Sequence, residues 1–244
     1  MKAALLYSGN IRTLPKTIND TLKCFLSIID EIDLYFSIWD HPGYVDNINS
    51  PDYMSAYHDF VGKIISEQDV MRCIEQNKRV NIKTIKIENY ISNSYKLNLL
   101  NETSDNLAAQ YYKILDCYNL LDDKIDYDIV ARMRCDMVVK NMIDRQKLLD
   151  AIMSGKIVFI EQIWYNHYKK PGINYINDLM WIANKEVCGK ACNIYDNSEK
   201  INKIITARNQ TEKNYGENIC YMNLEAEGLA NNIELFDFSY KILR

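Results

Sequence analysis

The chain has 244 residues, 48% of them hydrophobic, which is enough to bury a substantial core and predicts one domain. Its formal net charge of −4 argues against the basic surface that nucleic-acid binders usually carry, so no nucleic-acid partner is expected. The apolar runs are too short to span a membrane, and the N-terminus resembles a strand and not a signal peptide. The seven cysteines are scattered, which fits a reducing compartment. We therefore expect a cytoplasmic location.

The first forty residues predict a strand, a helix and a second strand. Residues 3–8 form an apolar run, and Gly9 then favours a turn. Thr13 is placed to cap a helix whose apolar residues recur at helical spacing as far as Ile29. The run 33–39 predicts the second strand, and the crossover between the two strands should be right-handed.

The middle of the chain predicts two helices on either side of a third strand. Ser66 and Asp69 match a capping box, which predicts a helix as far as about residue 78. Residues 82–88 alternate between apolar and polar side chains, as a partly exposed strand does. The clearest helix spans residues 104–121, where the apolar residues form one stripe.

The second half of the chain predicts shorter elements and a more irregular structure. They are a helix over 144–153, a strand over 156–163, a short strand at 181–182, helices beginning near Lys185 and Ser198, a helix over 216–230 and a strand over 233–238. Strands that alternate with helices in this way predict an α/β fold.

Residues 127–139 form an apolar run that predicts a buried strand, yet the run contains two arginines and an aspartate near its end. Side chains alternate in an extended chain, so Arg132, Arg134 and Asp136 would share one face. Buried charges are costly unless they are paired or bind something charged. Two interpretations follow: a structural arginine–aspartate pair, or a strand that runs out into a site for phosphate or a metal.

Polar groups also follow the first two predicted strands. Ser8 and Gly9 end the first strand, Arg12 comes shortly after them, and Asp40 follows the second strand. Ligands of open α/β sheets bind beyond the carboxyl ends of the strands, where Gly9 would permit a close backbone approach and Arg12 would reach an anion. Gly9 also fits an ordinary turn. The sequence lacks the glycine-rich patterns of dinucleotide folds and P-loops.

Four segments together resemble the GT-A fold of nucleotide-sugar-dependent glycosyltransferases. They are Ala-Leu-Leu-Tyr-Ser-Gly-Asn-Ile-Arg (residues 4–12), Asp-Leu-Tyr-Phe-Ser-Ile-Trp (33–39), the long helix, and Tyr-Asp-Ile-Val-Ala-Arg-Met-Arg-Cys-Asp (127–136). The last segment is similar to an R-x-R-x-D version found in bacterial and viral transferases of capsule and glycan synthesis. The resemblance covers most of the chain as a pattern and an order of elements.

The resemblance implies a single GT-A-like α/β domain over residues 1–244, with a mostly parallel central sheet flanked by helices. It implies a nucleotide-sugar-binding half (1–140) and a more irregular acceptor half (141–244). It also implies a glycosyltransferase that moves a hexose or pentose from a nucleoside diphosphate sugar to a glycan or lipid-linked acceptor. The nucleotide would lie near Ser8, Gly9, Arg12 and Asp40.

In GT-A enzymes the strand after the long helix ends in a D-x-D motif, which holds a divalent cation on the donor diphosphate. The matching triplet here is Arg134-Cys135-Asp136, so only the last acid is present. One carboxylate alone binds Mg²⁺ or Mn²⁺ weakly. We expect Asp136 to bind such a cation; in the alternative, Arg132 and Arg134 bind the phosphates in its place through bidentate contacts.

The resemblance also places Asp178 and Glu217 on the acceptor side. An inverting transferase needs one carboxylate to take the proton of the acceptor hydroxyl, and these two are the candidates. Each also has an ordinary explanation, Asp178 as a loop cap and Glu217 as an acid that the helix dipole favours. Two other functions stay open: a sugar nucleotidyltransferase, and a non-catalytic glycan-binding domain derived from a transferase.

Overall fold

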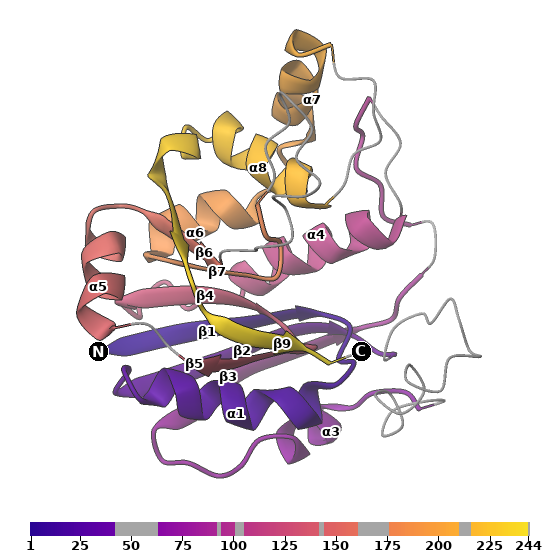
Figure 1. The fold of residues 1–244 in the computed structure, drawn as a ribbon. Coiled ribbons are helices and arrows are strands. Elements are labelled where there is room, and N and C mark those ends of the chain that lie inside the picture. The colour runs from indigo at the N-terminus through magenta and orange to yellow at the C-terminus, as the bar shows by residue number, and fades with distance from the viewer. Residues whose placement is uncertain are drawn as a thin grey trace.

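A computed structural model of the chain describes residues 1–41, 63–91, 94–100, 105–141, 144–160, 176–209 and 216–243 (Figure 1). Within these residues a seven-stranded sheet has the order β3-β2-β1-β4-β7-β6-β8. Its strands are β1 (Lys2–Gly9), β2 (Glu31–Trp39), β3 (Val80–Glu88), β4 (Ile129–Arg134), β6 (Ile157–Ile160), β7 (Met180–Ala183) and β8 (Ile233–Phe236). Only β7 in this sheet runs antiparallel to its neighbours. The prediction of a mostly parallel central sheet is therefore confirmed.

Helices cover both faces of the sheet (Figure 1). One face carries α1 (Leu14–Leu26), α3 (Glu67–Arg72) and α5 (Arg145–Met153), and the other carries α4 (Asp105–Tyr118), α6 (Lys185–Cys192) and α8 (Gly216–Ala226). α7 (Ser198–Ala207) packs on α8, and the short 3-10 helix η2 (Ala230–Asn232) precedes β8. No helix in the described ranges is both long and apolar enough to cross a membrane.

Strand β1 lies inside the sheet and is buried on both faces. Ala3 and Leu5 belong to the core beneath α1, whereas Ala4 and Leu6 belong to the core beneath α4. All four are 0% exposed. A strand that helices cover on both sides needs apolar residues at successive positions. This explains why the sequence shows a continuous apolar run here and not an alternating one.

The apolar run 127–139 forms two strands and not one. β4 ends at Arg134, Cys135 and Asp136 form a turn, and β5 (Met137–Asn141) then pairs with β9 (Ser239–Ile242) in a separate two-stranded sheet. Thr17 on α1 donates to the main-chain oxygen of Cys135 at 2.7 Å, so a helix distant in sequence anchors the turn. The prediction of a single strand is wrong, because Asp136 lies in the turn after β4; its side chain nevertheless pairs with that of Arg134.

Two helices are shorter than predicted. The capping box of Ser66 and Asp69 is present, yet α3 already ends at Arg72. α8 begins at Gly216 as expected but ends at Ala226. For α3 the start signal was correct, because a capping box is formed by residues close in sequence. The ends depend on packing and were overestimated.

The C-terminal segment adds a strand that the pattern did not indicate. β8 ends at Phe236 and β9 follows it. Leu243 then donates its main-chain N–H to the main-chain oxygen of Asp136 at 2.9 Å, and its carbonyl accepts a hydrogen bond from the Thr13 hydroxyl at 2.9 Å. The Thr13 side chain therefore holds the C-terminal segment and does not cap α1, contrary to the prediction.

α6 approaches α4 closely at Gly189. A β-carbon added to Gly189 would lie 2.5 Å from the Oη atom of Tyr118, whose hydroxyl donates to the carbonyl of Lys185 at 3.0 Å. We expect Gly189→Ala to lower the free energy of unfolding by about 1–3 kcal/mol, measured by urea denaturation, because the added methyl overpacks this contact. In a Tyr118→Ala background the same substitution should cost little. An equal cost in both backgrounds would contradict this explanation.

Candidate active site

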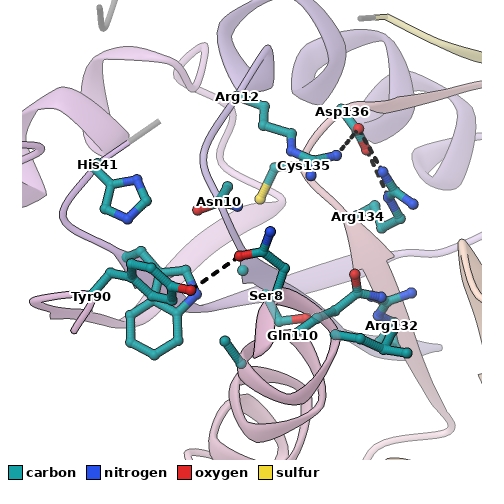
Figure 2. Close-up of a pocket in the computed structure, with 15 residues that line it drawn as sticks. Ser8, Asn10, Arg12, His41, Tyr90, Gln110, Arg132, Arg134, Cys135 and Asp136 are labelled. Carbon is teal, nitrogen blue, oxygen red and sulfur yellow. Dashed lines mark hydrogen bonds and ion pairs between the residues drawn. The ribbon is translucent and has the colours of Figure 1, made fainter. Parts of the chain in front are cut away.

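A cleft of about 240 Å³ opens at the carboxyl ends of β1, β2 and β4, beside the first turns of α4 (Figure 2). Parallel strands place their carboxyl ends at one edge of a sheet, where ligands of open α/β sheets bind. The lining residues come from segments far apart in the chain: Ser8, Gly9, Asn10, Arg12, Trp39, His41, Tyr90, Asn106, Leu107, Ala109, Gln110, Arg132, Arg134, Cys135 and Asp136.

The chain turns sharply where it leaves β1. Gly9 has a φ of +97° and Arg12 a φ of +43°, so both lie in the left-handed region. Glycine adopts this conformation without strain, whereas a residue with a side chain pays about 1 kcal/mol or more. The turn directs the Arg12 guanidinium towards Asp136, and the ion pair between them offsets this strain.

Asp136 lies between two arginines at the rim of the cleft (Figure 2). Its Oδ2 atom is 2.5 Å from Nη1 of Arg12 and 2.7 Å from Nη2 of Arg134, and its Oδ1 atom is 2.9 Å from Nε of Arg134. Burial alone would raise the pKa of Asp136, but Arg134 and then Arg12 outweigh burial and hold that pKa well below its usual range. Burial likewise opposes the charge of Arg134, yet Asp136 outweighs it and raises the pKa of that guanidinium.

Arg132 forms part of the floor of the cleft and is only 1% exposed. Its Nη1 atom donates to the main-chain oxygen of Asp178, and its guanidinium stacks on the Trp181 ring at 4.9 Å from the ring centroid. Its Nε and Nη2 atoms have no hydrogen-bond partner among the described residues. Burial lowers the pKa of Arg132, and the nearby Asp178 only partly reverses this effect. Arg132 is therefore a buried cation with two donors available for an acceptor.

Two further polar groups, at the end of β1 and just after it, are also buried without a hydrogen-bond partner among the described residues. Oγ of Ser8, in a side chain 5% exposed, and Oδ1 of Asn10 are buried and have no partner within the described part of the chain. Buried polar atoms are nearly always hydrogen-bonded in folded proteins, so a cluster of exceptions is characteristic of a binding site. Together with Arg132, these residues place polar groups without partners on one side of the cleft.

Aromatic rings form the opposite wall. Tyr90 stands edge-on to Trp39, with ring centroids 5.3 Å apart, and edge-on to His41, with centroids 5.0 Å apart. The Tyr90 hydroxyl donates to Oδ1 of Asn106 in the first turn of α4 at 3.1 Å. Burial lowers the pKa of His41, and the neighbouring Asp40 only partly opposes this effect. This wall suits a flat ring such as a nucleobase.

Asp40 does not line the cleft, although its sequence neighbours Trp39 and His41 do. Its carboxylate accepts a hydrogen bond from the main-chain N–H of Tyr90 at 3.3 Å, and its own N–H donates to the carbonyl of Glu88 at 2.9 Å. The predicted role of Asp40 in nucleotide binding stays a prediction. In the structure this residue fixes the segment that carries Tyr90.

Asp178 and Glu217, the two predicted bases, are close to one another beside the cleft. Gln110, which lines the cleft, donates to Oδ2 of Asp178 at 3.2 Å. A β-carbon on Gly216 would lie 2.9 Å from the same oxygen, so Asp178 packs against the start of α8, where Glu217 occupies the first turn. The main chains are also joined, because the N–H of Ile176 donates to the carbonyl of Glu217 at 3.3 Å. Both acids are partly exposed.

The residues around Asp136 do not fit a divalent cation. Mg²⁺ and Mn²⁺ need several oxygen ligands, whereas both oxygens of Asp136 already accept from guanidinium groups. In the described part of the chain no group of three or more histidine, cysteine, aspartate or glutamate side chains is arranged to hold a metal. Metal binding by Asp136 stays a prediction, and this geometry does not support it.

Six of the nine predicted site residues line one cleft: Ser8, Gly9, Arg12, Arg132, Arg134 and Asp136. The other three, Asp40, Asp178 and Glu217, do not line it; Asp40 contacts the main chain of Tyr90, and Asp178 accepts a hydrogen bond from Gln110. The prediction missed Asn10, Tyr90, Asn106 and Gln110. A signal for Tyr90 was present, because it follows the third strand as Asp40 follows the second. Asn106 and Gln110 are four residues apart, so they lie on one face of α4, beside its buried apolar stripe.

No protein-family model and no curated protein sequence matches the chain. Among solved structures, mouse xyloside xylosyltransferase 1 in its apo form matches with a TM-score of 0.51 at 8% identity, over 97% of this chain and 86% of that chain. The galactosyltransferase LgtC, in complex with donor and acceptor sugar analogues, gives a TM-score of 0.47 at 8% identity, over 96% of this chain and 73% of that one. The similarity to LgtC is too distant to support an argument, whereas the similarity to the xylosyltransferase shows the fold. The chain has the α/β GT-A fold.

Proposed function

We propose that the chain is a glycosyltransferase that moves a sugar from a nucleoside diphosphate sugar to a glycan or lipid-linked acceptor. The observation that carries the proposal is the cleft itself. Its arginines lie opposite an aromatic wall, and a pair of carboxylates lies beside it. A nucleoside diphosphate sugar has matching parts in the same order, with a base, two phosphates and a sugar. The GT-A fold agrees with this reading.

In the proposed complex the base lies against Tyr90 and His41, and the diphosphate lies against Arg12, Arg132 and Arg134. When the acceptor oxygen bonds to the sugar's anomeric carbon, the bond from that carbon to the phosphate oxygen breaks. The leaving nucleoside diphosphate takes the electron pair and gains negative charge. Guanidinium groups fixed near that oxygen stabilise the charge as it develops.

The acceptor hydroxyl must also lose a proton, and in an inverting reaction a carboxylate takes it. Asp178 is the better placed of the two candidates, because it is bonded to two residues that line the cleft. Its carboxylate accepts a hydrogen bond from Gln110, and its main-chain carbonyl accepts one from Arg132. Glu217, in the first turn of α8, would then contact the acceptor.

Residues 141–244 would form the acceptor half of one domain. All seven cysteines are free, which fits a reducing compartment, and we place the reaction in the cytoplasm.

The test is a panel of nucleoside diphosphate sugars assayed for release of the nucleoside diphosphate, with water, glycans and lipid-linked sugars as acceptors. We expect release from one donor and faster release with one acceptor. Pyrophosphate release from a nucleoside triphosphate and a sugar phosphate, without sugar transfer, would favour a nucleotidyltransferase instead. Glycan binding with no turnover of any donor would favour a non-catalytic domain.

We expect Tyr90→Ala to weaken nucleoside diphosphate binding about 5- to 150-fold, because stacking of a base on an aromatic ring contributes about 1–3 kcal/mol. Titration calorimetry measures this change directly. Tyr90→Phe keeps the ring and removes the hydroxyl that donates to Asn106, so its Kd should stay near the wild-type value. If both variants bind as the wild type does, the base does not lie against this wall.

A further inference from the structure

We infer that this cleft binds the diphosphate of its donor with guanidinium groups and without a divalent cation. The inference rests on the proposed function and goes beyond it, because the fold leads one to expect a metal at this position. It assigns Asp136 a different role, that of orienting two arginines. It also assigns Arg132, at the floor of the cleft, as the main contact of the phosphates.

The first argument is the coordination of Asp136. Three hydrogen bonds of 2.5–2.9 Å from Arg12 and Arg134 occupy both of its oxygens. The carboxylate is 1% exposed, so a cation would have to displace a guanidinium in order to reach it. Displacement would leave two cations close to the incoming metal, which is unfavourable at short range. Asp136 thus acts as the partner of the arginines.

The second argument is charge. Three arginines and one aspartate line the described cleft, which leaves two positive charges in excess at neutral pH. The diphosphate of a nucleotide sugar carries one negative charge on each of its two phosphates, so the two sets of charges balance. A bound divalent cation would leave the complex with an excess of positive charge. Charge complementarity of this kind favours binding and orients the ligand.

The third argument is the set of donors without partners. Nε and Nη2 of Arg132 lie on one edge of the guanidinium and have no acceptor among the described residues, and Oγ of Ser8 is in the same state. An arginine edge with two adjacent N–H groups matches two oxygens of one phosphate. Trp181 and the carbonyl of Asp178 hold the guanidinium in place, so little side-chain entropy is lost on binding.

The decisive experiment uses the wild-type chain with inorganic pyrophosphate, UDP, GDP, CDP and ADP as probes. Each is titrated by calorimetry in EDTA and again in excess Mn²⁺. We expect pyrophosphate and at least one nucleotide to bind with the same Kd in both buffers. Binding that is about tenfold or more tighter with Mn²⁺ would overturn the inference and leave the proposed function intact. Binding of no probe in either buffer would overturn both.

Mn²⁺ alone provides a second test. The electron paramagnetic resonance signal of free Mn²⁺ should not fall when the protein is added, with or without UDP. A loss of signal that Asp136→Asn abolishes would overturn the inference. Folded Asp136→Asn protein, checked by circular dichroism, should bind pyrophosphate with one and the same Kd in EDTA and in Mn²⁺, as the wild type does, because Asp136 orients Arg12 and Arg134 and binds no metal. A Kd that depends on Mn²⁺ in the wild type and not in the folded variant would also count against the inference.

Discussion

Replacing Arg132 with methionine is expected to weaken nucleoside diphosphate binding about 10²- to 10⁴-fold without lowering the melting temperature. Hydrogen bonds to a charged group contribute about 1.5–3 kcal/mol, and a bound phosphate would gain two of them from Arg132. The free protein behaves differently, because a buried guanidinium with unsatisfied donors costs free energy. Methionine has a similar length, packs well on Trp181 and removes that cost.

Calorimetry gives the Kd and differential scanning fluorimetry the melting temperature. Arg145→Met is the matched control: Arg145 lies on α5, is largely exposed and pairs with Asp30 away from the cleft. It should change neither quantity measurably. If Arg132→Met lowers the melting temperature by several degrees and leaves the Kd unchanged, Arg132 is a structural residue and not a ligand of the phosphates.

The central strands were predictable because their signal is local. Continuous apolar runs at residues 3–8 and 33–39 match β1 and β2 within two residues at either end, since a strand buried on both faces needs such a run. The break between β4 and β5 was not predictable in this way. The apolar pattern continues through residues 137–139, and only pairing with β9 and the hydrogen bond from Thr17 shows that the chain has left the main sheet.

The difference between local signals and contacts of distant segments also explains which site residues could be predicted. Ser8, Arg12 and Arg134 were found because a strand end is visible in the sequence and the carboxyl ends of parallel strands meet. The ion pairs of Asp136 were foreseen only as one of two interpretations, since pairing and metal binding need the same residue types. Gln110 was missed because the part of a helix that faces a cleft is set by how the helix packs on the sheet. The sequence thus indicates the edge of the sheet that binds a ligand better than it indicates the ligand's contacts.

Asp178→Asn is expected to slow sugar transfer about 10²- to 10⁴-fold, the usual contribution of a general base, with little change in donor binding. Asparagine keeps the size of the side chain and can still accept the hydrogen bond from Gln110, so the local structure should be retained. The carbonyl that holds Arg132 belongs to the main chain and is unaffected. The loss should therefore appear in kcat and not in the Kd of the nucleoside diphosphate.

Glu217→Gln is the matched comparison, because this acid occupies the first turn of the helix against which Asp178 packs. If Asp178 is the base, Glu217→Gln should lower kcat by about tenfold or less, and its effect should fall on the acceptor KM. A large loss of kcat in Glu217→Gln with near-normal turnover in Asp178→Asn would reverse the two roles. Normal turnover in both variants would exclude an inverting mechanism that uses either carboxylate. The base would then have to come from elsewhere, or the reaction would proceed with retention.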